Sequence, residues 1–133
     1  MYRYLIGETP IVSHDAEISS VSNSYVLIKT ITLANTLLAN RTLRIKFDLK
    51  ADTSGPPFFG RIYKNGSPIG TEQSTTSSSY VTFSEDIAGW NPSDTIELYI
   101  HELYDSGTVY AKNFRLCGTH AAVTANEVSG TTS

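Results

Sequence analysis

The stretch Thr42-Leu43-Arg44-Ile45-Lys46-Phe47-Asp48-Leu49-Lys50 alternates apolar and charged residues after its first position. Successive side chains leave a β-strand on opposite sides, so this period of two places the four apolar side chains on one face and the four charged ones on the other. A helix would scatter the four apolar residues around its circumference. The stretch therefore predicts a strand that is buried on one side.

The chain beyond this stretch predicts a β-hairpin. Phe58–Tyr63 and Ser67–Glu72 flank Asn65-Gly66, and both residues of that pair accept the positive φ that a type I′ turn requires. Further strands are expected at Asn23–Leu33, Ser79–Glu85, Thr95–His101 and Thr108–Leu116. In the last of these we expect a single alternation, with Tyr110, Lys112, Phe114 and Leu116 on one face and Val109, Ala111, Asn113 and Arg115 on the other.

Short strands, frequent turn signals and no convincing helical pattern predict an all-β fold, an antiparallel sandwich of two sheets. A jelly roll is the first choice and an immunoglobulin-like Greek key is the alternative. We expect the sandwich to span residues 21–118. Residues 1–20 are expected to form an N-terminal arm, because Pro10 and Ser13-His14-Asp15 interrupt regular structure, and Ile87–Asp94 is expected to be a turn. Residues 119–133 are expected to be a flexible polar tail.

The composition narrows the class of partner. The chain has 133 residues and a net charge of -3, and its ten Lys and Arg residues are spread out, so neither nucleic acid nor an anionic membrane is expected as a partner. The single cysteine, Cys117, lies in an apolar run that predicts a buried and inert thiol. No signal peptide is recognisable at the N-terminus, so synthesis and folding in a cytoplasm are expected.

Signatures of catalysis and of metal binding are missing from the sequence. His14, His101 and His120 lie far apart without a paired ligand, and no Gly-x-Ser-x-Gly motif is present. Adjacent carboxylates at Glu85-Asp86 would point to opposite faces of a strand. We therefore expect a protein that is not an enzyme and that uses no cofactor.

Two sets of residues are candidates for binding. Aromatic residues with polar neighbours such as Glu97 and His101 could stack on a sugar, or could equally belong to the core or to a subunit interface. The candidates for sugar stacking are Trp90, Tyr99, Tyr104 and Tyr110. The apolar residues of the N-terminal arm could dock on a neighbouring subunit or pack on their own domain. The candidates for this interface are Tyr2, Tyr4, Leu5 and Ile6.

Several phrases of the sequence resemble those of small β-sandwich proteins in the virions of tailed phages and related viruses, such as capsid decoration proteins and fibre modules. These phrases are Tyr63-Lys64-Asn65-Gly66-Ser67-Pro68-Ile69-Gly70-Thr71, Tyr80-Val81-Thr82-Phe83, Ile87-x-Gly89-Trp90, Asp94-Thr95-Ile96-Glu97-Leu98-Tyr99 and Asn113-Phe114-Arg115-Leu116. They fall between Tyr25 and Gly118. Sugar-binding jelly rolls share the phrase that ends in Asn-Phe-Arg-Leu.

The resemblance implies a structural protein at a virion surface, with copies of itself (such as a trimer) and a major capsid protein as partners. The leading expectation is thus a capsid decoration (cement) protein that binds the shell as a symmetric oligomer. The alternative is a carbohydrate-binding module or a receptor-binding tip of a fibre or tail.

Overall fold

The fold was obtained as a computed structural model, which describes residues 2–35, 37, 39–52, 57–102, 107–122 and 130–132. All of its regular elements are β-strands within these ranges. The strands are β1 (Tyr2–His14), β2 (Ile18–Ser20), β3 (Val26–Leu33), β4 (Arg41–Ala51), β5 (Phe58–Lys64), β6 (Ser67–Pro68), β7 (Gln73–Thr75), β8 (Val81–Trp90), β9 (Thr95–His101), β10 (Val109–Ala122) and β11 (Gly130–Thr132). The prediction of an all-β fold is confirmed.

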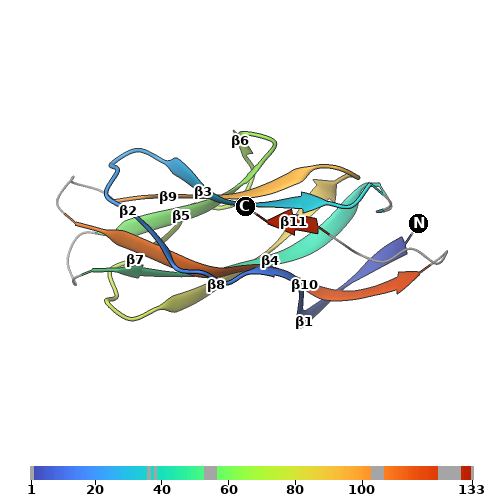
Figure 1. Cartoon of the computed structure of the whole chain (residues 1–133), viewed down its shortest axis with the longest axis horizontal. Coiled ribbons are helices and arrows are strands. Elements are labelled where there is room, and N and C mark those ends of the chain that lie inside the picture. Colours follow the sequence, from blue (N-terminus) through green and yellow to red (C-terminus); the bar gives the residue numbers. More distant parts are fainter. Residues whose placement is uncertain are drawn as a thin grey trace.

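The strands form two antiparallel sheets. The first has the order β1-β10-β4-β8, with β2 also paired to β10, and the second has the order β11-β3-β9-β5-β6, with β7 also paired to β5 (Figure 1). Each pairing encloses the next one along the chain: β1 and β2 with β10, then β3 with β9, then β4 with β8, and innermost β5 with β6 and β7. This nesting is the jelly-roll arrangement, so the first choice between the two sandwich topologies is confirmed.

The core lies between the inward faces of the two sheets. The apolar positions of β4 are buried as predicted, and in β9 the buried residues Ile96, Leu98 and Ile100 alternate with partly exposed ones. Lys29 of β3 is a buried charge at the margin of this core. Its ammonium lies 2.8 Å from Nδ1 of His14 and donates to the carbonyl of Ala16, while burial lowers its pKa. The lysine therefore ties the connection after β1 to the opposite sheet.

The alternation of β10 changes phase in the middle of the strand. Val109 and Ala111 are buried, and so are Phe114 and Leu116, although a regular strand would turn the second pair outward. The pairing with β4 shifts between Lys112 and Arg115, and Asn113 has φ of 52°. This is a β-bulge, in which one extra residue with left-handed backbone reverses the faces. The predicted single alternation is therefore wrong beyond Lys112.

A second irregularity places Trp90 in the core. β8 continues to this residue, so the predicted turn over Ile87–Asp94 is wrong in its first half, and a turn follows only from Asn91. Gly89 has φ of 89°, and the pairing with β4 shifts nearby, so that Ile87 and Trp90 both point inward. The Trp90 side chain is 0% exposed, which rules it out as a sugar-stacking surface in this conformation.

The N-terminal residues form an edge strand instead of the irregular arm that we expected. β1 pairs along most of β10, and register shifts around Pro10 accommodate the missing amide hydrogen. Tyr4 is buried in the core cluster, and its hydroxyl donates to the carbonyl of Cys117 and accepts the amide hydrogen of Arg44. Leu5 and Ile6 remain 42% and 44% exposed, while the side chain of Tyr2 lies outside the described part.

Residues 119–122 and 130–132 lie in strands and not in the expected flexible tail, while residues 123–129 and 133 fall outside the described part of the chain. β10 runs on to Ala122 beside the first half of β1, and the two strands extend together at the right of Figure 1. Gly130–Thr132 form β11, which pairs with β3 at an edge of the second sheet. Sheet pairing explains how residues 119–122 and 130–132 form strands without aromatic side chains, because backbone hydrogen bonds need no apolar side chain. The buried sulfur of Cys117, in contrast, agrees with the prediction.

Gly118 allows β1 to approach β10, and replacing it tests that packing. Gly118 has φ of 153°, and a Cβ atom there would collide with the carbonyl oxygen of Leu5 and the ring of Tyr4. We expect Gly118→Ala to lower the free energy of unfolding by about 2 kcal/mol or more in urea titrations. The matched control is Gly66→Ala, where φ is 87° but a Cβ meets nothing within 4 Å, so the loss should be only about 1 kcal/mol. Equal losses would contradict the proposed close packing.

Candidate functional site

Aromatic side chains gather on the outer face of the second sheet. Phe59 and Tyr63 come from β5, Tyr99 and His101 from β9, and Tyr25 from the residue just before β3. We call these five residues the aromatic face. Directly paired residues of antiparallel strands share a face, and Phe59 pairs with His101. The residues between them, including Ile62, Leu98 and Ile100, are buried, so the aromatic face points away from the core.

The rings of the aromatic face contact one another in a continuous series. Tyr63 and Tyr99 stack with centroids 3.8 Å apart and an interplanar angle of 23°, and Phe59 stacks on His101 at 4.6 Å and 17°. Tyr25 connects the two pairs, since its ring meets the His101 ring edge-on at 4.3 Å and lies 6.0 Å from Tyr63. Offset and edge-on arrangements of this kind hold rings in defined orientations. The aromatic face is thus a preorganised surface.

Polar groups border the aromatic face. The hydroxyl of Tyr25 donates to Oε2 of Glu72 at 2.7 Å, and burial together with that carboxylate raises the pKa of Tyr25. Arg61, which pairs with Tyr99 across the two strands, donates from Nε to the carbonyl of Gly70 at 2.7 Å. The carboxylate of Glu97 accepts the amide hydrogen of Gly66 at 2.7 Å. Negatively and positively charged side chains, each able to form hydrogen bonds, are therefore held in place beside the apolar surface of the rings.

His101 has a defined tautomer when neutral. Its Nδ1 lies 2.6 Å from the carbonyl oxygen of Glu102, and a carbonyl oxygen only accepts, so Nδ1 carries the proton. In the neutral ring Nε2 is then an acceptor. The histidine contributes both ring surface and an acceptor nitrogen to the aromatic face.

Only one of the predicted sugar-stacking residues belongs to the aromatic face. This is Tyr99, whereas Trp90 is in the core, Tyr110 lies on the other sheet and Tyr104 falls outside the described residues. Sequence reasoning missed the other four members as stacking residues. The alternation Phe59-x-Arg61-x-Tyr63 and Tyr99-x-His101 is the signal that could have found three of them, because it places aromatic rings on one outward face of each strand.

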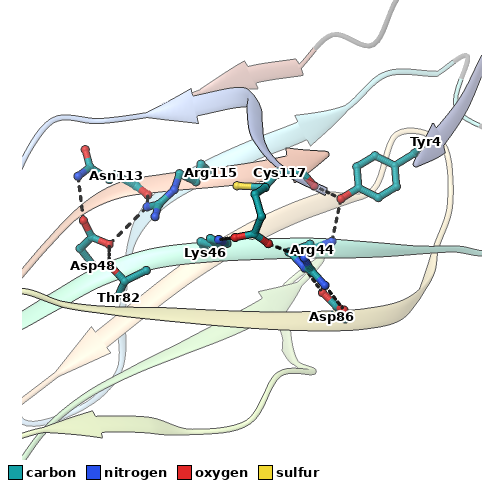
Figure 2. A network of polar contacts seen from close by, with 10 residues as sticks. Tyr4, Arg44, Lys46, Asp48, Thr82, Asp86, Asn113, Arg115 and Cys117 are labelled. Atoms are coloured by element: carbon teal, nitrogen blue, oxygen red, sulfur yellow. Dashed lines mark hydrogen bonds and ion pairs between the residues drawn. The ribbon is translucent and has the colours of Figure 1, made fainter. Parts of the chain in front are cut away.

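The outer face of the first sheet has a different chemistry, a network of ion pairs (Figure 2). Arg44 binds Asp86 through two nitrogens, with Nε 2.8 Å from Oδ1 and Nη2 3.0 Å from Oδ2. It also pairs with Glu8, which pairs in turn with Lys46. Hydrogen bonds from Lys46 and Arg44 lower the pKa of Glu8, and those from Arg44 lower the pKa of Asp86.

A second group in Figure 2 centres on the buried carboxylate of Asp48. This carboxylate accepts hydrogen bonds from Thr82 and Asn113 at 2.8 Å each, and Nη1 of Arg115 lies 3.4 Å away. The amide of Asn113 comes from the bulge of β10, so the bulge that reverses the strand also satisfies this carboxylate. Three donors from β8 and β10 therefore surround the Asp48 carboxylate.

Other kinds of site were sought in the same residues. Within the described ranges, no three His, Cys, Asp or Glu side chains lie together in a way that could hold a metal ion. The described part of the chain likewise holds no helix with the length and apolar character needed to cross a membrane.

Comparisons with known proteins give a likeness in fold. The sequence matches no protein-family model and no curated protein sequence. Its structure is similar to that of the EclA C-terminal domain, which is described as a sugar-binding protein. The match has a TM-score of 0.60 and 12% sequence identity, and it covers 80% of this chain and 81% of that one. At this identity the likeness establishes a shared β architecture.

The pairing of Arg44 with Asp86 predicts a dependence of stability on acid. Because the pKa of Asp86 is lower in the folded state, the pair stabilises the fold above the ordinary pKa of aspartate, near pH 4, and this stabilisation is lost as the pH falls through the folded value. In Arg44→Met, the fall in unfolding free energy between about pH 5 and pH 3 should be shallower than in the wild type.

Urea titrations at a series of pH values measure this slope. Arg41→Met is the matched control, because the Arg41 guanidinium donates to the carbonyl of Ala39 and forms no ion pair within the described residues. Parallel acid slopes for Arg44→Met and the wild type would contradict the pairing.

Proposed function

We propose that the chain is a carbohydrate-binding module and that the aromatic face is its binding surface. The observation that supports this proposal is the meeting of five rings from three separate segments, Tyr25, β5 and β9, on one outward face with charged groups at its border. A sheet face that only contacts solvent would instead carry mostly polar side chains, without a series of rings in contact.

The chemistry of the aromatic face suits a sugar ring. A pyranose has C–H groups on its flat sides and hydroxyl groups around its rim. The C–H groups can lie on the rings of Tyr63, Tyr99 and Phe59, where apolar surface leaves water. Rim hydroxyls can donate to Glu72, Glu97 or Nε2 of His101 and accept from Arg61. No group has to become buried without a hydrogen-bond partner.

The structural comparison adds support of a general kind. A sugar-binding protein domain shares the architecture over most of both chains, so this sandwich is compatible with carbohydrate binding. The binding residues follow from the side chains of this chain and not from the likeness, because a fold alone does not define a site.

Glycan-array screening, followed by titration calorimetry with the best ligand, tests the proposal. We expect Tyr63→Ala and Tyr99→Ala each to weaken binding by about tenfold, equivalent to about 1.4 kcal/mol, since each removes one stacking ring. Val21→Ser is the matched control, because it removes an exposed apolar side chain that belongs neither to the aromatic face nor to β1. Trp90→Ala is unsuitable, since Trp90 is a core residue. Failure to bind any glycan, or full binding by both tyrosine variants, would overturn the proposal.

We also propose that the module acts at a virion surface as a symmetric oligomer, as a decoration protein or as the receptor-binding tip of a fibre or tail, after synthesis in the host cytoplasm. The observation in favour is β1, an edge strand in which the consecutive residues Leu5 and Ile6 are both exposed. An edge strand offers unpaired backbone groups to another copy of the chain, and two exposed apolar side chains add to the area buried. Of the residues expected at such an interface, Tyr4 instead packs in its own core.

The mass of the purified protein in solution tests the oligomer. Deleting the N-terminal residues would remove a strand of the sheet, so the sharper change is the double variant Leu5→Lys/Ile6→Lys, which keeps β1 but places like charges at the edge. We expect an oligomer for the wild type and a monomer of unchanged fold for the variant, measured by light scattering and circular dichroism. A wild-type monomer at every concentration would rule out the oligomer.

A further inference from the structure

Two lysines on the outer face of the first sheet lie against tyrosine rings. The ammonium of Lys50 is 4.9 Å from the ring centroid of Tyr80 and 5.0 Å from that of Tyr110, and the ammonium of Lys112 is 4.3 Å from the Tyr80 centroid. Tyr110 pairs with Lys50 across β10 and β4, which places both outward. We call Lys50, Lys112, Tyr80 and Tyr110 the lysine–tyrosine cluster.

The cations elsewhere along this face are neutralised by carboxylates. Arg44 pairs with both Glu8 and Asp86, Lys46 pairs with Glu8, and Arg115 pairs with Asp48. Lys50 and Lys112 form no ion pair and no hydrogen bond within the described residues. The carboxylate of Asp48, although it pairs in register with Lys112, is already occupied by its three partners.

The carboxylate of Glu17 contacts the cluster as well, because it accepts a hydrogen bond from the hydroxyl of Tyr80. This contact fixes the hydroxyl end of the Tyr80 ring, and Glu17 forms no ion pair with either lysine. A ring face attracts a cation but supplies no oxygen acceptor for its N–H groups. Two positive charges with unused donors are thus held close to one ring at the protein surface.

From this arrangement we propose that the lysine–tyrosine cluster binds an oxyanion, namely a sulfate or carboxylate group of an acidic glycan. An oxyanion relieves the repulsion between the two ammonium groups and accepts their free hydrogen bonds. The tyrosine rings supply apolar surface for the sugar that bears the anion. The anion site follows from the lysines alone, while the glycan as its source rests on the proposed function.

This site is separate from the aromatic face. The two lie on the outer faces of opposite sheets, with the core between them. One chain would therefore contact neutral sugar surface on one side and an acidic group on the other. A polymer with both features could connect separate copies of the module, which increases avidity without any new contact.

Titration with inorganic sulfate, followed by NMR of isotope-labelled lysine side chains, tests the anion site without any glycan. We expect saturable shifts at Lys50 and Lys112 that disappear in the double variant Lys50→Gln/Lys112→Gln. Lys46→Gln is the matched control, because Lys46 lies on the same face of β4 but is paired with Glu8, and it should leave the titration unchanged. Shifts that do not saturate, or that are as large at Lys46, would overturn the proposal.

A second measurement identifies the source of the anion. A sulfated oligosaccharide should bind about tenfold or more tightly than its desulfated form, and the double lysine variant should remove that difference. Equal affinity for the sulfated and the desulfated form would overturn the proposal that an acidic glycan supplies the anion.

The double variant Tyr63→Ala/Tyr99→Ala separates this inference from the proposed function. Sulfate binding should persist in this variant, since the aromatic face lies on the other sheet, and loss of sulfate binding in a folded variant would overturn the separate site.

Discussion

The alternation of β4 is the constraint on which the rest of the structure depends. This strand lies inside the first sheet, between β10 and β8, so its apolar side chains define one wall of the core. Burying that face necessarily turns Arg44, Lys46, Asp48 and Lys50 outward. A slip of one residue would bury four charges and expose four large apolar side chains, and neither is tolerable. One strand therefore sets both the core and the charged outer surface.

The inner faces of both sheets are used up by the core. The side chains that can contact a ligand therefore lie on the two outer faces of the sandwich. On the first sheet, charges outnumber rings and most of them pair with each other. On the second, rings contact rings and the charges bind backbone groups at the border. The two surfaces suit different parts of a ligand, and neither requires a cleft. A binding protein that uses sheet faces in this way can remain rigid, since no loop has to close.

Much of the fold could be predicted from local patterns. β9 has the predicted bounds, β4 differs by one residue at each end, and the choice of a jelly-roll sandwich was right. The errors lie at Asn113 and Gly89, where a residue with positive φ inserts into a strand and reverses its faces. The pattern of alternation cannot reveal such a bulge, because the sequence on each side of the inserted residue still has the regular pattern of a strand. Sequence reasoning also left β1 and β11 unassigned, since edge strands gain much of their order from backbone pairing with distant partners.

The sequence by itself determined the class of the protein: period-two alternation with Asn-Gly and proline breaks permits little besides an antiparallel sandwich. It also determined which types of residue were available for binding. Tyr99 was predicted from the sequence as a sugar-stacking residue and belongs to the aromatic face. Only the tertiary structure decided which rings meet. Tyr25, Tyr63 and Tyr99 are far apart along the chain, and the sequence left Trp90 open between sugar stacking and the core until its burial was known. The reason is physical: alternation assigns a side chain to a face, but the order and register of the strands decide which face is covered and which residues become neighbours across it.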